Sequence, residues 1–569
     1  MVRRGGGHGM PRTLQIKAIS APDGAATLRD TGRPVLLIGF QNQGNLGLGY
    51  LAATLREHGY RVQTLDFERP PDEILEAVRE LKPILIGFSL IFQFYVRRFA
   101  SVIRFLRDND VSCHITMGGH FPSLSYAEAL REVPDLDSIV LYEGELTLVE
   151  LVDRLSTGQN WRQIRGVAYT VDGEAFATPL RPLIEDLDRL PYPERNYEPP
   201  KVLGRTIMPL LASRGCIRRC SFCSIHTFYR TAPGRVVRTR RPVEVVREMR
   251  ALYEERGVTI FLFQDDDFPL FGKVWRKWAS EFVDELWRSG LVGRVIWKIN
   301  CRADVVETEI FARMQAAGLY LVYMGLESGS AEGLETLNKG ITVEQNMRAV
   351  ETLKRMGLAF EYGFMLFDPS TTFHSVRANL DFLRAIVGDG ATAATFCRML
   401  PYDGTPIKDE LARSGRLRGD VCDPDYDFLD PRLQDFYAEL TSVVDIQGWI
   451  HGYEGLSLQL SWAWHEVAVL ERLFPLLPGM ADYKQRLRRI TSASNTLLLQ
   501  VVEDLSYAFS DDRPNDWSAE TVEEHRRRFQ AQLRTERDAF VLDNEAVLLE
   551  ALGQPTARAP SMSVAAAHA

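Results

Sequence analysis

Short apolar runs alternate with amphipathic stretches over the first quarter of the chain. Each run is as short as a buried strand, and the stretches between them carry apolar residues at helical spacing. The strand candidates are residues 33–40, 61–67, 84–90 and 113–119, and the helix candidates are 48–60 and 96–109. This βαβ pattern continues through 138–155 and predicts a doubly wound, Rossmann-like α/β domain over residues 31–155.

Such a domain binds ligands at the carboxyl ends of its parallel strands. In this chain those ends are residues 41–49, Ser89, 118–123 and 142–145, and glycines recur in them. Glycine lets the backbone approach a ligand closely. Each glycine alone is equally well explained as an ordinary turn residue.

The alternation is interrupted from 156 to 205 and then resumes. Residues 190–204 contain four prolines and cannot form a helix, so we expect 156–205 to be a linker. Six further β/α units predict a partial, open TIM-like (β/α)6 barrel over 206–410, with its active site at the carboxyl ends of the strands. Its strand candidates lie near 207–213, 258–263, 295–300, 320–326, 359–366 and 393–399.

The pattern after the barrel is mostly helical, and we expect a separate C-terminal domain over 411–552. Its aromatic residues Tyr453, Trp462 and Trp464 suit either the roof of a substrate pocket or, as is more common, a hydrophobic core. We expect residues 420–552 to cap the barrel and to close its active site from water. The end segments, 1–30 and 553–569, are predicted to be flexible and disordered.

Composition narrows the class of protein. A chain of 569 residues with 45% hydrophobic content can bury a large core. The net charge of −9 argues against nucleic acid as the main partner. No long apolar run predicts a membrane span or a secretory signal, so we expect a cytoplasmic protein with no membrane partner.

Seven cysteines, three of them clustered, indicate a reduced compartment and a metal site rather than a disulfide framework. The clustered residues form a C-x3-C-x2-C motif: Cys216, Cys220 and Cys223. Thiolates at this spacing favour an iron–sulfur cluster or zinc. The zinc alternative would use His226 as a fourth ligand. Against it, the motif ends a strand inside a long alternation rather than forming a small separate module.

The three motif cysteines and the segments around them resemble the radical S-adenosylmethionine (SAM) superfamily. Segments 238–268, 299–306, 321–330 and 399–407 resemble one branch of it, and 44–67 and 117–151 resemble that branch's cobalamin-binding domain. The chain thus resembles a cobalamin-dependent radical SAM enzyme over about residues 33–408.

The resemblance implies three cofactors: a [4Fe-4S] cluster, SAM and cobalamin. Three thiolates would hold three irons, and SAM would occupy the fourth. An electron from a donor such as flavodoxin or ferredoxin would then cleave SAM to methionine and a 5′-deoxyadenosyl radical.

The resemblance also implies SAM-binding residues at the barrel strand ends. These are Glu327 and Ser328 in "GLESGS", Arg302 in "CRAD", and Asp265 and Asp266 in "QDDDF". The motif does not rank these aspartates against Asp267, and Arg302 alone is also explained as a capping or surface ion pair. The barrel cysteines Cys301 and Cys397 are more typical of small apolar core residues.

For cobalamin, the resemblance implies the strand-end residues of the first domain. They are Asn45, Leu46, Gly47, Ser89, Gly118, Gly119, His120, Glu143 and Gly144. The chain lacks the D-x-H-x-x-G pattern that supplies a histidine to cobalt in some cobalamin proteins. His120 is the nearest histidine in the expected loop, and lying beside the cofactor is the more common role for such a residue.

Three functions stay open at this stage. The first is methylation of an unactivated carbon in a specialised metabolite, with cobalamin carrying the methyl group. The second is a radical cyclisation or rearrangement with the same cofactors. The third is a non-catalytic iron–sulfur or cobalamin sensor, which the complete barrel disfavours. Substrate identity and oligomeric state are not accessible from the sequence.

Overall fold

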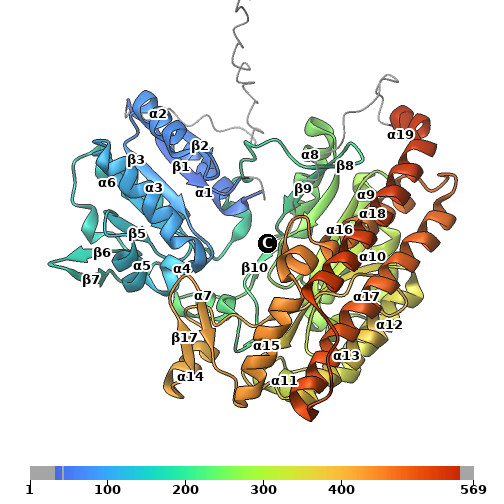
Figure 1. The fold of residues 1–569 in the computed structure, drawn as a ribbon. Coiled ribbons are helices and arrows are strands. Elements are labelled where there is room, and N and C mark those ends of the chain that lie inside the picture. The colour runs from blue at the N-terminus through green and yellow to red at the C-terminus, as the bar shows by residue number, and fades with distance from the viewer. Residues whose placement is uncertain (1–31, 42–43, 552–569) are drawn as a thin grey trace, which may run out of the picture.

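A computed structural model describes residues 32–41 and 44–551. The flexible ends predicted at 1–30 and 553–569 lie outside the described residues. Figure 1 shows an N-terminal α/β domain beside a larger unit that combines the barrel with the C-terminal helices.

The first domain is built on a seven-stranded sheet with the order β2-β1-β3-β4-β5-β6-β7. Its first five strands are parallel: β1 (Val35–Gly39), β2 (Val62–Asp66), β3 (Leu85–Ser89), β4 (His114–Gly118) and β5 (Ser138–Val140). The strand order reverses between β1 and β3, which makes this the switch point where doubly wound sheets bind ligands.

Helices cover both faces of this sheet because successive β1 residues point to opposite sides. Leu36 and Ile38 pack in one cluster with α2 (Pro71–Leu81), α3 (Val96–Asp108) and α5 (Tyr126–Glu132). Val35 and Leu37 pack in the other with α1 (Leu46–Glu57) and α6 (Glu145–Ser156). The prediction of a Rossmann-like domain is confirmed.

The segment expected to be a linker differs from the prediction in its first half. Residues 167–177 form the hairpin β6 (Val167–Val171) and β7 (Glu174–Ala177), which extends the first sheet in antiparallel fashion. The turn is Asp172-Gly173, with both residues at positive φ, as a two-residue hairpin requires.

The second sheet forms the predicted partial barrel, with the order β16-β15-β14-β13-β12-β9-β8. Six strands are parallel, and β8 (Lys201–Val202) adds an antiparallel edge. The parallel strands are β9 (Arg205–Leu210), β12 (Val258–Phe263), β13 (Ile296–Arg302), β14 (Leu319–Glu327), β15 (Ala359–Phe367) and β16 (Cys397–Arg398).

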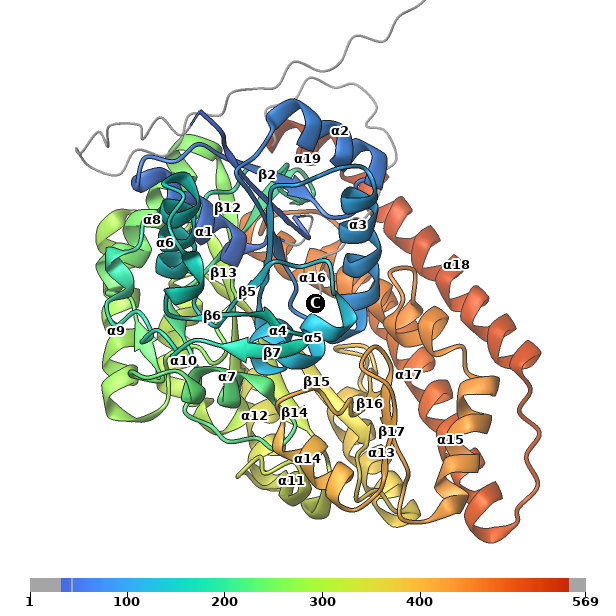
Figure 2. The same ribbon diagram turned by 90° about the vertical axis from the view of Figure 1, so that its left-hand side faces the viewer.

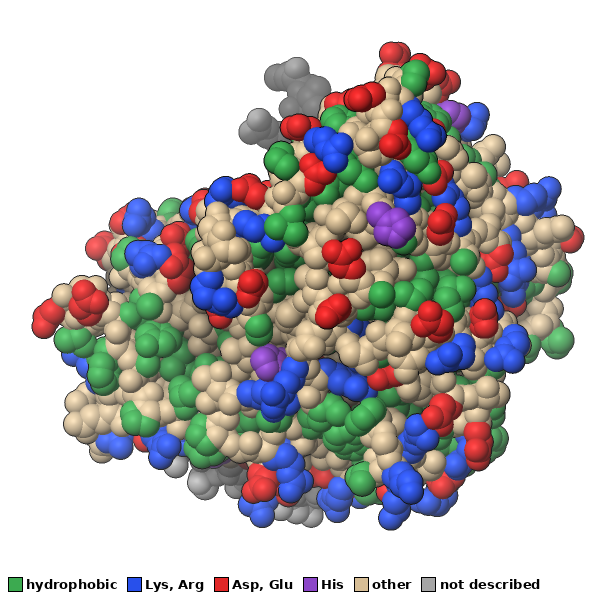
Figure 3. All heavy atoms as spheres, turned by 90° about the horizontal axis from the view of Figure 1, so that it is seen from below, with side chains coloured by type: hydrophobic (Ala, Val, Ile, Leu, Met, Phe, Trp, Pro, Cys, Tyr) green, Lys and Arg blue, Asp and Glu red, His purple; other side chains and the backbone are tan. Residues whose placement is uncertain are grey.

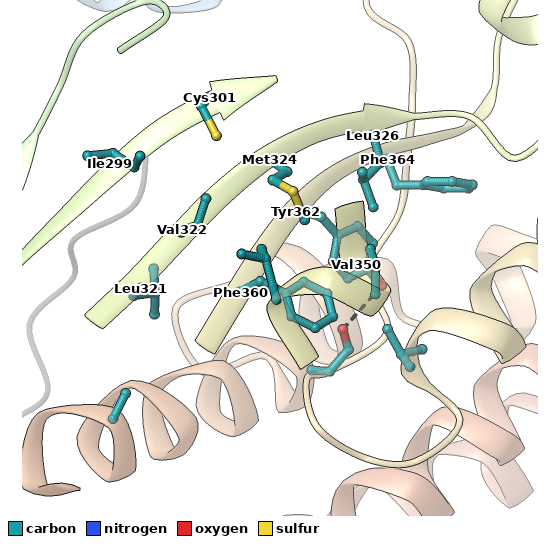
Figure 4. Close-up of a cluster of buried hydrophobic side chains, with 14 of the residues drawn as sticks. Ile299, Cys301, Leu321, Val322, Met324, Leu326, Val350, Phe360, Tyr362 and Phe364 are labelled. Atoms are coloured by element: carbon teal, nitrogen blue, oxygen red, sulfur yellow. Dashed lines mark hydrogen bonds between the residues drawn. The ribbon is translucent and has the colours of Figure 1, made fainter. Parts of the chain in front are cut away.

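The outer helices pack on the apolar side of these strands. They are α8 (Pro242–Arg256), α9 (Gly272–Ser289), α10 (Thr308–Ala316), α12 (Val343–Met356) and α13 (Phe373–Val387). Figure 4 shows side chains of β13, β14 and β15 in one layer with Val350 of α12. Figure 2 shows α8, α9 and α10 on one side of the barrel and α15, α17 and α18 on the other.

The C-terminal region is helical, as predicted, but it shares one continuous core with the barrel. Its helices are α15 (Pro431–Val443), α16 (Leu456–Leu473), α17 (Met480–Asp511), α18 (Ala519–Asp543) and α19 (Glu545–Ala551), reached through α14 (Pro406–Arg413) and the hairpin β17 (Leu417–Gly419)/β18 (Pro424–Tyr426). Trp462 and Trp464 pack against this core, whereas Tyr453 is 62% exposed.

The surface carries both signs of charge, and Figure 3 shows acidic and basic side chains interspersed with apolar ones on the face seen from below. Among the helices of the described residues, none is both long and apolar enough to cross a bilayer.

Candidate active site

The motif cysteines lie on one closed loop at the mouth of the barrel. This cysteine loop, residues 215–237, starts after β10 (Ser213–Arg214) and ends at β11 (Arg238–Thr239), and the two strands pair as an antiparallel neck. Gly215 has φ +87°, and a Cβ there would lie 2.0 Å from the carbonyl oxygen of Val236. Only glycine permits this close approach, so Gly215 is required by the neck.

Backbone hydrogen bonds hold the tip of the loop against the barrel. The Ser221 amide donates to the Leu337 carbonyl at 3.0 Å, and the Ile407 amide donates to the Ser221 carbonyl at 3.0 Å. Asn338 donates to the Arg219 carbonyl at 2.6 Å. The loop is therefore fixed to the segments that follow β14 and β16.

The three motif thiols are partly or fully withdrawn from solvent. Cys220 is buried, and Cys216 and Cys223 are half-buried. Burial raises the pKa of Cys216 to about 12 and that of Cys223 to about 11, so bound iron must stabilise the thiolates. In a [4Fe-4S] cluster, each of the three cysteines would bind a different iron.

The three aspartates after β12 face different partners. Asp265 is 2% exposed and accepts hydrogen bonds from the Ser213 hydroxyl and the Ala212 amide. Asp266 accepts the Gly215 amide at 3.0 Å and thereby supports the neck of the cysteine loop. These contacts tie both carboxylates to the segment that leads into the cysteine loop, and their expected contacts with SAM stay predictions.

Asp267 is the aspartate that lines a small cavity beside Cys216. Its Oδ1 is buried and has no hydrogen-bond partner among the described residues. Burial raises its pKa to about 6, against the opposing charges of Arg218 and Arg302. Asp267 therefore has an oxygen that can accept a hydrogen bond from a ligand in this cavity.

Arg302 lies near Asp267, and its positive charge acts to lower the pKa of that carboxyl group. Its Nε donates to Asp304 at 3.0 Å, and its Nη1 is buried without a partner in the described part of the chain. Arg218, inside the cysteine loop, donates to the same Asp304 at 3.0 Å. Asp304 therefore joins the cluster loop to the end of β13, which the sequence pattern did not reveal.

The two residues from "GLESGS" differ in orientation. Glu327 has φ +64° and pairs with Lys339 at 2.8 Å. Ser328 is fully buried, and its hydroxyl donates to Asn379 at 3.0 Å. Ser328 thus stabilises the strand end, and the carboxylate of Glu327 is the better placed of the two for a ligand.

The cobalamin candidates gather along the carboxyl edge of the first sheet. Asn45 begins α1 and accepts the Leu48 amide at 3.0 Å, and Gly47 lies beside it. A Cβ on Gly39 would meet both Ser89 and Asn45, so the ends of β1 and β3 meet at the switch point. The other candidates lie at or after the ends of β1, β4 and β5: Leu46, Gly118, Gly119 and Gly144.

His120 begins the short helix α4 (His120–Leu124) and faces the cysteine loop. Its ring centroid lies 4.3 Å from that of Phe228, on α7 (Ser224–Thr231). Burial lowers its pKa to about 4, so the imidazole is neutral at pH 7. Its Nε2 has no hydrogen-bond partner within the described residues, which leaves a polar atom for a ligand at this edge.

Glu143 does not face the open edge of the sheet. Both of its carboxylate oxygens are bound by Arg238 at 2.9 Å, and Arg214 and the Ile184 amide bind them as well. The Glu143 side chain is thus held in a buried contact with the neck of the cysteine loop, and its expected contact with cobalamin stays a prediction.

In each of the two sheets the carboxyl ends of the parallel strands form one edge, and these two strand-end edges lie against each other. His120 and Tyr142 of the first domain both pack on Phe228 of the cysteine loop. On another side, Gln93 after β3 donates to the Val421 carbonyl at 2.8 Å and accepts the Asp403 amide at 2.7 Å.

Two family models match the chain: the B12 binding domain over residues 40–152 and the radical SAM superfamily over residues 210–383. An uncharacterized methyltransferase of Pyrococcus horikoshii is 29% identical over 419 residues, which cover 72% of this chain and 87% of that protein. An anaerobic magnesium-protoporphyrin IX monomethyl ester cyclase of Rubrivivax gelatinosus is 31% identical over 336 residues, which cover 56% of this chain and 58% of that protein. The solved structure of the cobalamin-dependent SAM radical enzyme OxsB shares the fold, with a TM-score of 0.66 at 18% identity over 92% of this chain and 84% of that one.

The two matched models cover the two units that meet at this edge: the Rossmann-like domain and the barrel that carries the three-cysteine loop. The chain belongs to the cobalamin-dependent radical SAM enzymes, and its cofactors are a [4Fe-4S] cluster, SAM and cobalamin.

Proposed function

We propose that the protein methylates an unactivated carbon of a small specialised metabolite. The observation that supports this most is the contact between the two strand-end edges, through Phe228 on one side and Gln93 on the other. One substrate placed there would lie within reach of both cofactors. When bound, the cofactors supply a 5′-deoxyadenosyl radical and a transferable methyl group.

We assign the cluster to Cys216, Cys220 and Cys223. Around SAM, we propose Asp267 for a donor group such as the amino group, Arg302 for the carboxylate and Glu327 for the ribose or amino group. A guanidinium with a free Nη1 suits a carboxylate because it can form two parallel hydrogen bonds.

For cobalamin, we propose the edge formed by Asn45, Ser89, Gly118 and Gly119, with the Nε2 of His120 as a polar contact. Gly119 has φ +116°, and a Cβ there would lie 2.1 Å from the Leu90 carbonyl oxygen, so the turn after β4 packs directly on the segment after β3.

The similarity to a methyltransferase over most of both chains supports methyl transfer. The similarity to a cyclase, which spans 58% of that protein, supports a radical cyclisation as the second candidate. Both reactions use the same cofactors, so the mass of the product separates them.

The deciding experiment uses protein purified without air after co-expression with cobalamin uptake. It should carry about four irons and about one cobalamin, and it should cleave SAM when reduced. With metabolites encoded by neighbouring genes as candidate substrates, methylation adds the mass of one methylene, whereas oxidative cyclisation removes hydrogens. If the reduced protein does not cleave SAM, the non-catalytic sensor becomes the remaining hypothesis.

We also propose that the reducing electron comes from flavodoxin or ferredoxin. Three arginines of the cysteine loop are exposed: Arg219, Arg230 and Arg235. They place positive charge close to the cluster in a protein of net charge −9, which suits an acidic donor.

A further inference from the structure

The neck of the cysteine loop contains two arginines that face each other. Arg214 of β10 and Arg238 of β11 are directly opposite in the antiparallel ladder. Both side chains are buried. Like charges directly opposite in a ladder are destabilising, and burial removes the water that would screen them. The neck therefore needs an anion.

The first domain supplies that anion. The Oε1 of Glu143 lies 3.2 Å from Arg214 and 2.9 Å from Arg238. Glu145 binds the other side of Arg214 at 2.7 Å. Both glutamates follow β5, on the domain that binds cobalamin, and the arginines border the loop that carries the motif cysteines.

The remaining contacts of Glu143 orient its carboxylate toward the neck. The Ile184 amide donates to Oε2 at 2.7 Å, and Arg238 donates to the Ile184 carbonyl at 2.8 Å. Asp266 also feels the charges of both arginines, but it accepts the Gly215 amide rather than forming an ion pair with either of them. No second acidic side chain on the described residues bridges both arginines as Glu143 does.

We infer that Glu143 is a positioning residue that closes the neck of the cysteine loop only when the cobalamin-binding domain is docked on the barrel. The conformation of the cluster loop is thereby made dependent on the other domain. This inference rests on the proposed assignment of the cluster to the motif cysteines, and it gives Glu143 no contact with cobalamin, SAM or substrate.

The test uses the full-length chain with Glu143→Gln, which keeps the size of the side chain and removes its charge. The matched control is Glu150→Gln, on the same domain, because Glu150 pairs with Arg181 and Arg154 away from the loop. Hydrogen exchange in cofactor-free protein is measured over residues 215–237. Cobalamin binding and the midpoint potential of the reconstituted cluster are measured separately.

Glu143→Gln should speed exchange in the cysteine loop at least tenfold and leave exchange in β1 to β4 unchanged. The midpoint potential should become more positive, because a nearby negative charge is lost. Cobalamin affinity should stay within twofold of wild type. Glu150→Gln should change none of the three.

A double variant separates positioning from general destabilisation. Adding Arg238→Met to Glu143→Gln removes one of the two facing charges, so loop exchange should return toward the wild-type rate. If Glu143→Gln alone does not fold, loop exchange in the double variant is compared with loop exchange in Arg238→Met. The difference between these two again measures the effect of removing the charge of Glu143.

Loop exchange equal to wild type in Glu143→Gln would overturn the inference, as would a tenfold loss of cobalamin affinity without a change in the loop. Additive effects in the double variant would also overturn it. None of these measurements needs substrate or turnover. A wild-type protein that fails to methylate would therefore refute the proposed function without affecting this result.

Discussion

Gly215, at the neck of the cysteine loop, is a position where one added methyl group should abolish cluster binding. A Cβ there would lie 2.0 Å from the Val236 carbonyl oxygen, and ordinary contact begins near 3.4 Å. Gly215→Ala must therefore open the β10–β11 neck by well over an ångström. Backbone strain of roughly 1–2 kcal/mol and overpacking of roughly 1–3 kcal/mol together destabilise the closed loop by roughly 2–5 kcal/mol.

The control is Gly257→Ala at the end of α8. Gly257 also has positive φ, +63°, but no heavy atom lies within 4 Å of the added Cβ. This variant carries the backbone strain alone, about 1 kcal/mol.

Iron and sulfide content after anaerobic reconstitution is the readout, and thermal unfolding of both variants shows that the rest of the protein is folded. We expect Gly257→Ala to bind a full cluster and Gly215→Ala to bind little iron. Equal iron in the two variants would refute the argument that the closed neck holds the motif cysteines in place.

Three further predictions concern the cluster, a buried ion triad and pH. Replacing any motif cysteine with Ala should abolish SAM cleavage, measured as 5′-deoxyadenosine; full cleavage would show that the cluster is held elsewhere. Glu248→Ala leaves Arg195 and Arg240 buried without their shared carboxylate, so the free energy of unfolding should fall by roughly 3–5 kcal/mol in denaturant titrations, whereas Glu254→Ala on the exposed side of the same helix should change it by less than about 1 kcal/mol. Because burial lowers the pKa of His120 from 6.5 to about 4, the unfolded chain binds a proton in this window and the folded protein does not. Stability of the cofactor-free protein should therefore fall as pH drops from 6.5 to about 4, and His120→Phe should reduce that loss by about 2 kcal/mol; an unchanged pH profile would contradict the buried, neutral imidazole.

The sequence predicts the parallel strands of both sheets because each is a short apolar run followed by a helix. It did not predict β6 and β7, although Asp172-Gly173 between two alternating runs is a hairpin signal. The four prolines of residues 190–204 indicate an irregular segment, and the predicted linker extends this interpretation to all of residues 156–205.

The sequence predicts which loops form the candidate site, but it does not predict which side chains of those loops face the cavity. Asp265, Asp266 and Asp267 are consecutive, so their side chains point in different directions, and only the surrounding backbone decides which one faces the cavity. Likewise Glu143 lies at a strand end, as predicted, but its partners are on β10 and β11, far away in sequence. Contacts of this kind depend on how the two domains dock.

The shared core of the barrel and the C-terminal helices has a consequence for how the chain folds during synthesis. The last barrel strand, β16, is complete at Arg398, whereas α17 and α18, which finish the core, begin at Met480 and Ala519. One face of α13 packs on α17, where Arg384 meets Glu503 and Asn495 binds the Val387 carbonyl. This face of α13 therefore leaves the ribosome before α17, the helix that covers it, has been synthesised. A nascent chain that ends before α17 must keep the surface covered by chaperones or non-native contacts, and the barrel becomes a stable unit only when the last long helices have been translated.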